Sequence, residues 1–205
     1  MIATRAVSTV NHYLATFSGF LYWCENNHYC DQLGKHCVRF TKSLKDPDPL
    51  TYEEYLSLIE KGCLHPIDKA AVTLAVYTGL RPGELLALAV EDVAPDFSKI
   101  TVRRSITQSV TFKVPKTKKE RTVLLQPPAR DALKVLVADA EQREAADLTV
   151  WLNRHESRID HVRVLLSPKT QARKAAVNDY FVPSAWNTKW INLVRRAETR
   201  PRPPY

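Results

Sequence analysis

Apolar residues recur at three- and four-residue steps over residues 4–25, which predicts an amphipathic helix. Residues 26–50 lose this period and end in the sequence DPDP, which is typical of a linker. One amphipathic helix cannot bury its apolar stripe by itself. We therefore expect residues 1–26 to be the last helix of a truncated N-terminal domain, and residues 27–50 to be a linker.

Residues 51–98 predict three consecutive helices. A capping box at residues 51–54 opens the first of them, because a threonine is followed three residues later by a glutamate. Pro66 suits the first turn of a second helix, which is expected to end at Gly79. Pro82 can then open a third helix. The short chain between Gly79 and Pro82 is therefore expected to form a helix–helix corner.

After residue 98 the hydrophobic period changes from that of a helix to that of a strand. Residues 100–112 and 121–125 alternate apolar and polar side chains, which predicts two strands joined by a lysine-rich turn. The later elements are expected to be a helix at 127–145, a short strand or extended piece at 162–168, and a final helix at 182–198. Residues 51–205 thus predict one α+β domain, mainly helical, with a small antiparallel sheet.

Positive charge is concentrated in two segments of a chain whose net charge is +8. Residues 99–130 carry 9 basic and 1 acidic side chains, and residues 154–205 carry 11 and 4. The rest of the chain carries 10 basic and 17 acidic side chains. Such concentration suggests a polyanionic partner, and nucleic acid is the usual one. A solvated basic surface without a partner fits the charge equally well.

The sequence gives little support for a metal site or a membrane segment. No two of the cysteines have the spacing of a zinc finger or ribbon; they are Cys24, Cys30, Cys37 and Cys63. No stretch approaches the length of a membrane span, and the first residues contain no apolar signal core. We expect reduced thiols, a cytoplasmic location, and no metal, cofactor or membrane partner.

Arg81 lies at the expected helix–helix corner, beside apolar neighbours. A charge in such a place is costly unless something pairs with it. In the structural interpretation, Glu84 pairs with Arg81 across one helical turn. In the functional interpretation the guanidinium also meets a phosphate, since its planar fork matches two phosphate oxygens. An arginine fixed by the backbone is suited to stabilising a transition state.

The lysine-rich turn VPKTKKERTVLL also has two interpretations. A solvated turn of this kind discourages edge-to-edge association of strands. Alternatively its cations follow a nucleic-acid backbone, and one lysine donates a proton to a leaving oxygen; the cations are Lys116, Lys118, Lys119 and Arg121.

In combination, these features resemble the catalytic domain of tyrosine site-specific recombinases, the phage integrase family. The segment TGLRPGELLAL, followed by strands and by VPKTKKERTVLL, carries the resemblance. The segment LTYEEYLSLIE resembles the first helix of that catalytic domain. The segment TVNHYLATFSGFLYWCENNHY resembles the last helix of the family's N-terminal DNA-clamping domain. The segment WINLVRRAETRPRPPY resembles the lead-in to the family's second catalytic arginine.

The resemblance implies a role for each matching residue. Arg81 would bind the scissile phosphate, and Glu84 would brace the site. Lys116 would protonate the 5′ leaving oxygen, with Lys118 as a second candidate because the KTKK run permits a small register error. The further DNA contacts would be Arg103, Arg104, Lys118, Lys119 and Arg121. The family's chemistry uses arginine and lysine instead of a metal ion.

The same resemblance implies that the family's second arginine, histidine and tyrosine nucleophile would follow Tyr205. His155, His161 and Tyr180 do not have the spacing for these roles. We therefore expect the 205-residue chain alone to be inactive in cleavage. Its parent would break and rejoin duplex DNA together with other recombinase protomers in a synaptic complex. The alternatives are a non-catalytic DNA-binding module, and a basic helical domain that binds RNA or another protein.

Overall fold

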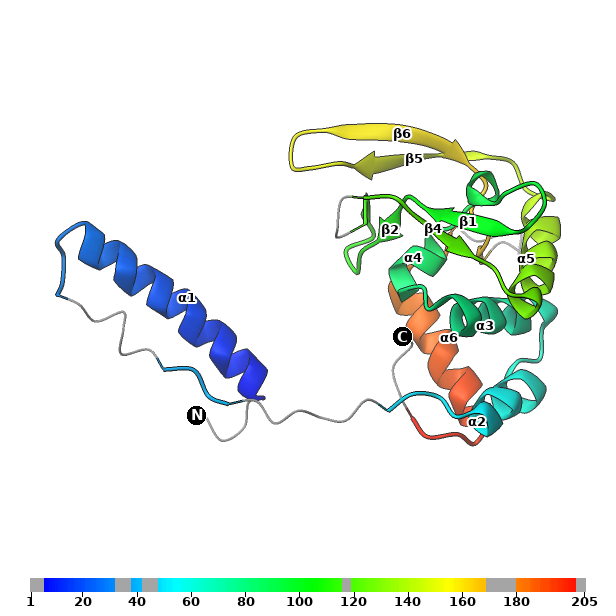
Figure 1. Ribbon diagram of the computed structural model, residues 1–205, viewed down its shortest axis with the longest axis horizontal. Coiled ribbons are helices and arrows are strands. Elements are labelled where there is room, and N and C mark those ends of the chain that lie inside the picture. The colour runs from blue at the N-terminus through cyan, green and yellow to red at the C-terminus, as the bar shows by residue number, and fades with distance from the viewer. Residues whose placement is uncertain (1–5, 32–37, 42–47, 116–118, 169–179, 202–205) are drawn as a thin grey trace. The chain divides into compact units, whose positions relative to one another are not determined.

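The computed structural model describes residues 6–31, 38–41, 48–115, 119–168 and 180–201 (Figure 1). The chain divides into two compact units, Met1–Pro49 and Leu50–Tyr205. Among the described residues, no helix is long and apolar enough to cross a membrane.

The first unit is built on helix α1 (Val7–Asn26). The side-chain amide of Asn11 holds a later segment onto this helix, because it both donates to and accepts from the backbone of Phe40 at 2.8 Å. Three aromatic rings of the helix stack in a row, with centroids 6.4 and 6.5 Å apart, and each is more than half exposed; they are Phe17, Phe20 and Trp23. The predicted helix is present, and its aromatic stripe is exposed within this unit.

The second unit combines helices with two small sheets, and the predicted α+β class is confirmed. Its helices are α2 (Tyr52–Ser57), the π-helix η3 (Leu58–Gly62), α3 (Pro66–Thr78), α4 (Pro82–Leu86), the 3-10 helix η4 (Val90–Asp92), α5 (Pro127–Ala140) and α6 (Pro183–Arg196). Its strands are β1 (Lys99–Val102), β2 (Ser105–Ile106), β3 (Phe112–Lys113), β4 (Arg121–Leu124), β5 (Ala146–Trp151) and β6 (Ser157–Val162).

Local sequence signals set the helix boundaries in this unit. The hydroxyl of Thr51 accepts from the backbone N–H of Glu54 at 3.2 Å, and the Glu54 carboxylate accepts from the Thr51 N–H at 2.9 Å, so the predicted capping box is confirmed. Pro66 occupies the first turn of α3. Gly79 ends that helix in the left-handed conformation, with φ of 60°, which a glycine adopts without strain.

The strands form two sheets, whereas the sequence predicted a single antiparallel one. Strands β1 and β4 pair antiparallel, from Lys99 opposite Leu124 to Val102 opposite Arg121. A second sheet has the order β2-β3-β5-β6, and its central β3–β5 pair is parallel. Figure 1 places β5 and β6 as a long hairpin beyond β1, on the side of the unit away from α2.

The β5–β6 hairpin is absent from the sequence prediction, which has only an extended piece at 162–168. Its apolar signal is weak, because in β5 only Leu148 and Val150 are fully buried. In β6 the isoleucine, Ile159, points outward and is 70% exposed. A strand that covers the core with two side chains does not produce a clear period in the sequence.

Two apolar clusters hold the second unit together. The larger one joins α3, α4 and α5 to both sheets. The smaller one packs α6 against η3 and includes Leu58, Trp190 and Leu193. Gly62 permits this close approach, since a Cβ atom there would lie 2.7 Å from the carbonyl oxygen of Leu193. The helical side and the strands therefore form one framework around the corner at Arg81.

Candidate active site

The corner between α3 and α4 presents Arg81 to solvent on a fixed backbone. Gly79 reverses the chain, and Pro82 begins α4 immediately after Arg81. The side chain of Arg81 is 66% exposed. Because the backbone on both sides is constrained, the guanidinium starts from a defined point on the surface. We name residues 79–84 the Arg81 corner.

A buried carboxylate fixes this corner from below. Glu84 is 2% exposed and accepts from the backbone N–H of Arg81 at 2.9 Å and from its guanidinium at 3.2 Å. Arg121 of β4 donates to the same carboxylate through both terminal nitrogens, at 2.8 and 2.6 Å. Glu84 thus joins the first turn of α4 to strand β4. Its contacts satisfy the requirement that a buried charge be paired and hydrogen-bonded.

The protonation of Glu84 follows from these contacts. Burial alone would raise its pKa, but the hydrogen bonds from Arg121 and Arg81 outweigh burial and hold the pKa below the ordinary value. In return, the bond to Glu84 raises the pKa of Arg121. The carboxylate is therefore ionised at neutral pH, and Arg121 keeps its charge.

Close packing fixes α4 against the sheet from a third direction. A Cβ atom at Gly83 would lie 2.4 Å from the carbonyl oxygen of Ile106 and 2.8 Å from the hydroxyl oxygen of Ser105. Only glycine permits this approach of α4 to β2. The backbone beside Arg81 is therefore held by β2 through Gly83 and by β4 through Glu84.

Arg104 lies in the interior and not on the predicted DNA-binding surface. Its side chain is 2% exposed, and its guanidinium binds the carboxylates of Asp92 and Asp160. Its Nε also donates to the carbonyl oxygen of Ala87 at 3.4 Å. Because each of its three guanidinium nitrogens donates to one of these acceptors, Arg104 links η4, β6 and the end of α4. We therefore leave it out of the proposed DNA contacts.

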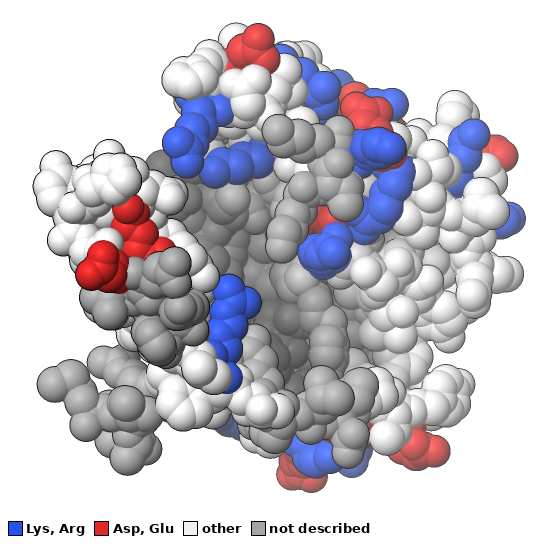
Figure 2. All heavy atoms as spheres, turned by 60° about the vertical axis from the view of Figure 1, so that its left-hand side comes forward, with Lys and Arg blue, Asp and Glu red and all other residues white. Residues whose placement is uncertain are grey.

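Arg103 and Lys119 are more accessible than Arg104. The Arg103 side chain is 38% exposed and lies 3.5 Å from the carboxylate of Glu120 and 3.7 Å from that of Asp92. Lys119 is exposed. Lys and Arg side chains gather at the top of the face in Figure 2, at the level where Figure 1 places the strands. Lys116 and Lys118, the two candidates for the proton donor, lie outside the described residues.

The two histidines of the hairpin make their hydrogen bonds to residues outside the Arg81 corner. His155 lies in the turn between β5 and β6, where Asn153 accepts its backbone N–H at 2.8 Å. His161 is on β6, and its Nδ1 lies 2.7 Å from the Asp147 carboxylate. Within the described ranges, no group of histidine, cysteine and carboxylate side chains could hold a metal ion.

Sequence reasoning missed two features of this site. It assigned Arg121 to DNA, although both of its terminal nitrogens bind Glu84. It also missed the carboxylates around Arg104, namely Asp92 and Asp160. A signal was present for the first feature. A buried acid in the first turn of α4 is only partly paired by one exposed arginine, so a second cation is expected beside it. The partners of Arg104 come from separate elements and give no local signal.

Comparison with known proteins identifies the family and the fold of the chain. Residues 48–185 match the model of the phage integrase family. The prophage integrase IntR of Escherichia coli strain K12 is 31% identical over 98% of this chain, which covers 49% of that protein. The chain spans about half the length of the curated relatives that it matches.

Two solved structures share the fold. The Tn1549 transposon integrase, in complex with a circular intermediate DNA, has a TM-score of 0.68 at 17% identity, over 98% of this chain and 63% of that one. The XerA recombinase has a TM-score of 0.54 at 20% identity, over 83% and 50%. At these identities the likeness establishes the fold of the chain.

Proposed function

The chain belongs to the phage integrase family, and we propose that it supplies the phosphate-binding corner and part of the DNA-binding surface of a tyrosine recombinase. Such an enzyme breaks and rejoins DNA strands during site-specific integration and recombination. Its location would be the cytoplasm of a bacterium, where chromosomal and phage DNA meet. Its partners would be duplex DNA and further protomers.

The observation that carries the proposal is the Arg81 corner. An exposed guanidinium is held by a buried, ionised carboxylate, and that carboxylate is itself held by a second arginine. A surface arginine needs no such support merely to make the protein soluble. A group that must meet a phosphate in one orientation gains from it, because preorganised charges lose no energy to rearrangement during reaction.

The chemistry at this corner would be phosphoryl transfer without a metal ion. Arg81 would donate to two non-bridging oxygens of the scissile phosphate and neutralise the charge that grows there as a tyrosine oxygen attacks phosphorus. The bond between phosphorus and the 5′ oxygen would break, and the leaving oxygen would take a proton from Lys116, or from Lys118 in the alternative register. We place the attacking tyrosine outside these 205 residues.

Glu84 and Arg121 would not touch the substrate. Glu84 is 2% exposed and faces away from solvent, and the guanidinium of Arg121 is turned toward the Glu84 carboxylate. We assign both as positioning residues that set the direction of Arg81. Arg121 also begins β4, and Lys116 and Lys118 precede it by a few residues in the sequence. Its ion pair with Glu84 links the start of this strand to the Arg81 corner.

The test is duplex-DNA binding by the 205-residue chain, measured by fluorescence anisotropy. Arg81→Ala is expected to weaken binding about tenfold, which is the size of one charge-assisted hydrogen-bonded contact. Lys134→Ala is the control, since Lys134 is an exposed cation on α5, paired only with the nearby Asp131 among the described residues. It should bind as the parent does. Equal DNA affinities of the parent and Arg81→Ala would contradict the proposed phosphate contact.

A covalent assay tests whether the attacking tyrosine lies outside these 205 residues. A nicked suicide duplex that contains the recombination site should form no protein–DNA adduct with the 205-residue chain. An adduct on one of its tyrosines would contradict our placement of the nucleophile. A preference for duplex RNA over duplex DNA would favour the alternative of a basic RNA-binding domain.

A further inference from the structure

We propose that the end of the β5–β6 hairpin is a second DNA-contact site, which holds the sugar–phosphate backbone of duplex DNA beside the Arg81 corner. The proposal rests on the proposed function, because it takes duplex DNA as the ligand. It concerns a surface that none of the predicted site residues occupies.

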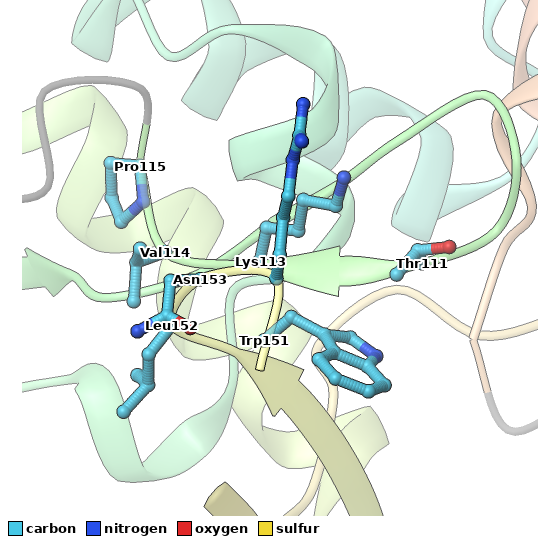
Figure 3. A pocket seen from close by; sticks show the side chains of 8 residues that line it. Thr111, Lys113, Val114, Pro115, Trp151, Leu152 and Asn153 are labelled. Carbon is cyan, nitrogen blue, oxygen red and sulfur yellow. The ribbon is translucent and has the colours of Figure 1, made fainter. Parts of the chain in front are cut away.

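The site is a surface pocket of about 800 Å³ between the two segments that β3 and β5 lead into. We name it the hairpin pocket; its lining residues are Thr111, Lys113, Val114, Pro115, Trp151, Leu152, Asn153 and Arg154 (Figure 3). Both segments belong to the second unit, so the pocket lies within one compact body.

Backbone pairing fixes both walls of the hairpin pocket. Lys113 pairs with Trp151 in the parallel β3–β5 ladder, and the N–H of Val114 donates to the carbonyl oxygen of Trp151 at 3.2 Å. On the other side, the carboxamide oxygen of Asn153 accepts the N–H groups of His155 and Glu156, at 2.8 and 3.0 Å. The turn that carries Arg154 is therefore held in shape.

The two charged residues that line the pocket are both cations. Lys113 and Arg154 are exposed, and among the described residues neither makes an ion pair. No carboxylate lines the pocket. Glu156, the acid of the turn, is engaged by the Asn153 amide at 2.6 Å. Two unpaired cations over a pocket without an acid are complementary to an anion.

Most of the other lining residues are apolar and suit the sugar of a nucleotide. Figure 3 shows the Trp151 ring and the side chains of Val114, Pro115 and Leu152 around the pocket, with the Lys113 amine higher in the view. Trp151 is 37% exposed. A deoxyribose packs against such a surface while its phosphate meets the cations. Backbone contacts of this kind fix the register of a protein on DNA without reading sequence.

The position of the pocket suits a contact that positions DNA for Arg81. Pro115 lines it and immediately precedes residues 116–118, which contain both candidates for the proton donor. Lys113 also pairs with Ser105 of β2, and β2 packs against Gly83 of the Arg81 corner. A phosphate held at Lys113 and Arg154 would therefore lie on the same duplex as the phosphate at Arg81. The hairpin would thereby position DNA for Arg81 without taking part in the chemistry.

The experiment compares Lys113→Ala, Arg154→Ala and the control Lys134→Ala with the parent 205-residue chain. Each is titrated against one labelled duplex of mixed sequence between about 50 and about 200 mM salt. Losing one phosphate contact should reduce the drop in affinity over this range by about 3.5-fold, because each contact contributes about 0.9 to the salt slope. Thermal unfolding of each variant checks that the fold is kept.

The outcomes separate this proposal from the proposed function. If the parent binds duplex DNA and both hairpin variants keep its affinity and salt slope, the hairpin pocket is not a DNA contact, and the proposed function stands. If the parent binds no duplex DNA, the proposed function itself fails. A smaller slope for both variants, with an unchanged slope for Lys134→Ala, supports the second contact.

A single-stranded oligonucleotide of the same sequence tests the identity of the occupant. Trp151→Ala should weaken duplex and single-strand binding by similar factors if the ring contacts sugar. A loss on the single strand several times larger than on the duplex would mean that an unstacked base fills the pocket, since aromatic rings stack on single-stranded bases. That result would overturn the assignment to the duplex backbone.

Discussion

The Arg81 corner and the hairpin pocket both present cations, but they hold them in opposite ways. At the corner, one exposed arginine rests on a carboxylate that is 2% exposed and that accepts four hydrogen bonds from Arg81 and Arg121. At the pocket, Lys113 extends from a paired strand and Arg154 from the β5–β6 turn, and neither has an ion pair among the described residues. A charge that must stabilise a transition state needs preorganisation, whereas a charge that only attracts DNA does not.

This difference predicts unequal costs of mutation, and the largest concerns Glu84. Glu84→Ala removes the carboxylate and leaves the inner side of Arg121 without an acceptor, so we expect a loss of about 3 kcal/mol in the free energy of unfolding. Urea denaturation measures it. Lys113→Ala and Arg154→Ala should each change the same quantity by less than about 0.5 kcal/mol. Similar values for all three variants would erase the contrast between the two regions.

The second prediction concerns the backbone beside Arg81. Gly83→Ala places a methyl group 2.4 Å from the carbonyl oxygen of Ile106, which is backbone and cannot rotate away. Overpacking of this kind should lower the free energy of unfolding by about 2 kcal/mol and weaken DNA binding by moving α4. Gly79→Ala is the comparison, because it adds only φ strain of about 1 kcal/mol with no atom within 4 Å of the new Cβ. A neutral Gly83→Ala would show that α4 is free to shift.

A double-mutant cycle provides the third and most direct comparison. If Arg121 acts through Glu84 to orient Arg81, Arg121→Gln should weaken duplex binding only while Arg81 is present. The double variant Arg81→Ala/Arg121→Gln should then bind within about twofold of Arg81→Ala alone. Lys113→Ala and Arg154→Ala should instead combine additively in free energy, since each would meet its own phosphate. Additive losses at Arg81 and Arg121 would return Arg121 to the DNA surface.

The sequence predicted the corner better than the pocket for a physical reason. Helix ends are local features, and Gly79, Pro82 and Glu84 lie within six residues of one another, so their spacing alone indicates a braced arginine. The pocket depends on β3 lying parallel to β5, a pairing of residues 38 positions apart, as Lys113 and Trp151 are. Nothing in either short strand specifies its partner. Arg104 failed as a surface prediction for the same reason, because Asp160 comes from the unpredicted hairpin.

The last and smallest prediction uses pH to test the ion pair that fixes the corner. The folded pKa of Glu84 lies below its ordinary value, because Arg121 and Arg81 stabilise the carboxylate more than burial opposes it. Its contribution to stability is therefore complete above the unfolded pKa of about 4.3 and is lost as pH falls through the lower folded pKa. The difference in unfolding free energy between the parent and Glu84→Gln should stay constant from neutral pH down to the unfolded pKa and shrink below it.

Urea denaturation of both proteins in a series of acidic buffers gives that difference directly. Because the glutamine of Glu84→Gln does not titrate, all other carboxylates cancel between the two proteins. A difference that stayed constant through the acid range would mean that the carboxylate gains nothing from its two arginines. The Arg81 corner would then be held no more firmly than the hairpin pocket. Only the exposure of Arg81 would still support a catalytic role for the corner.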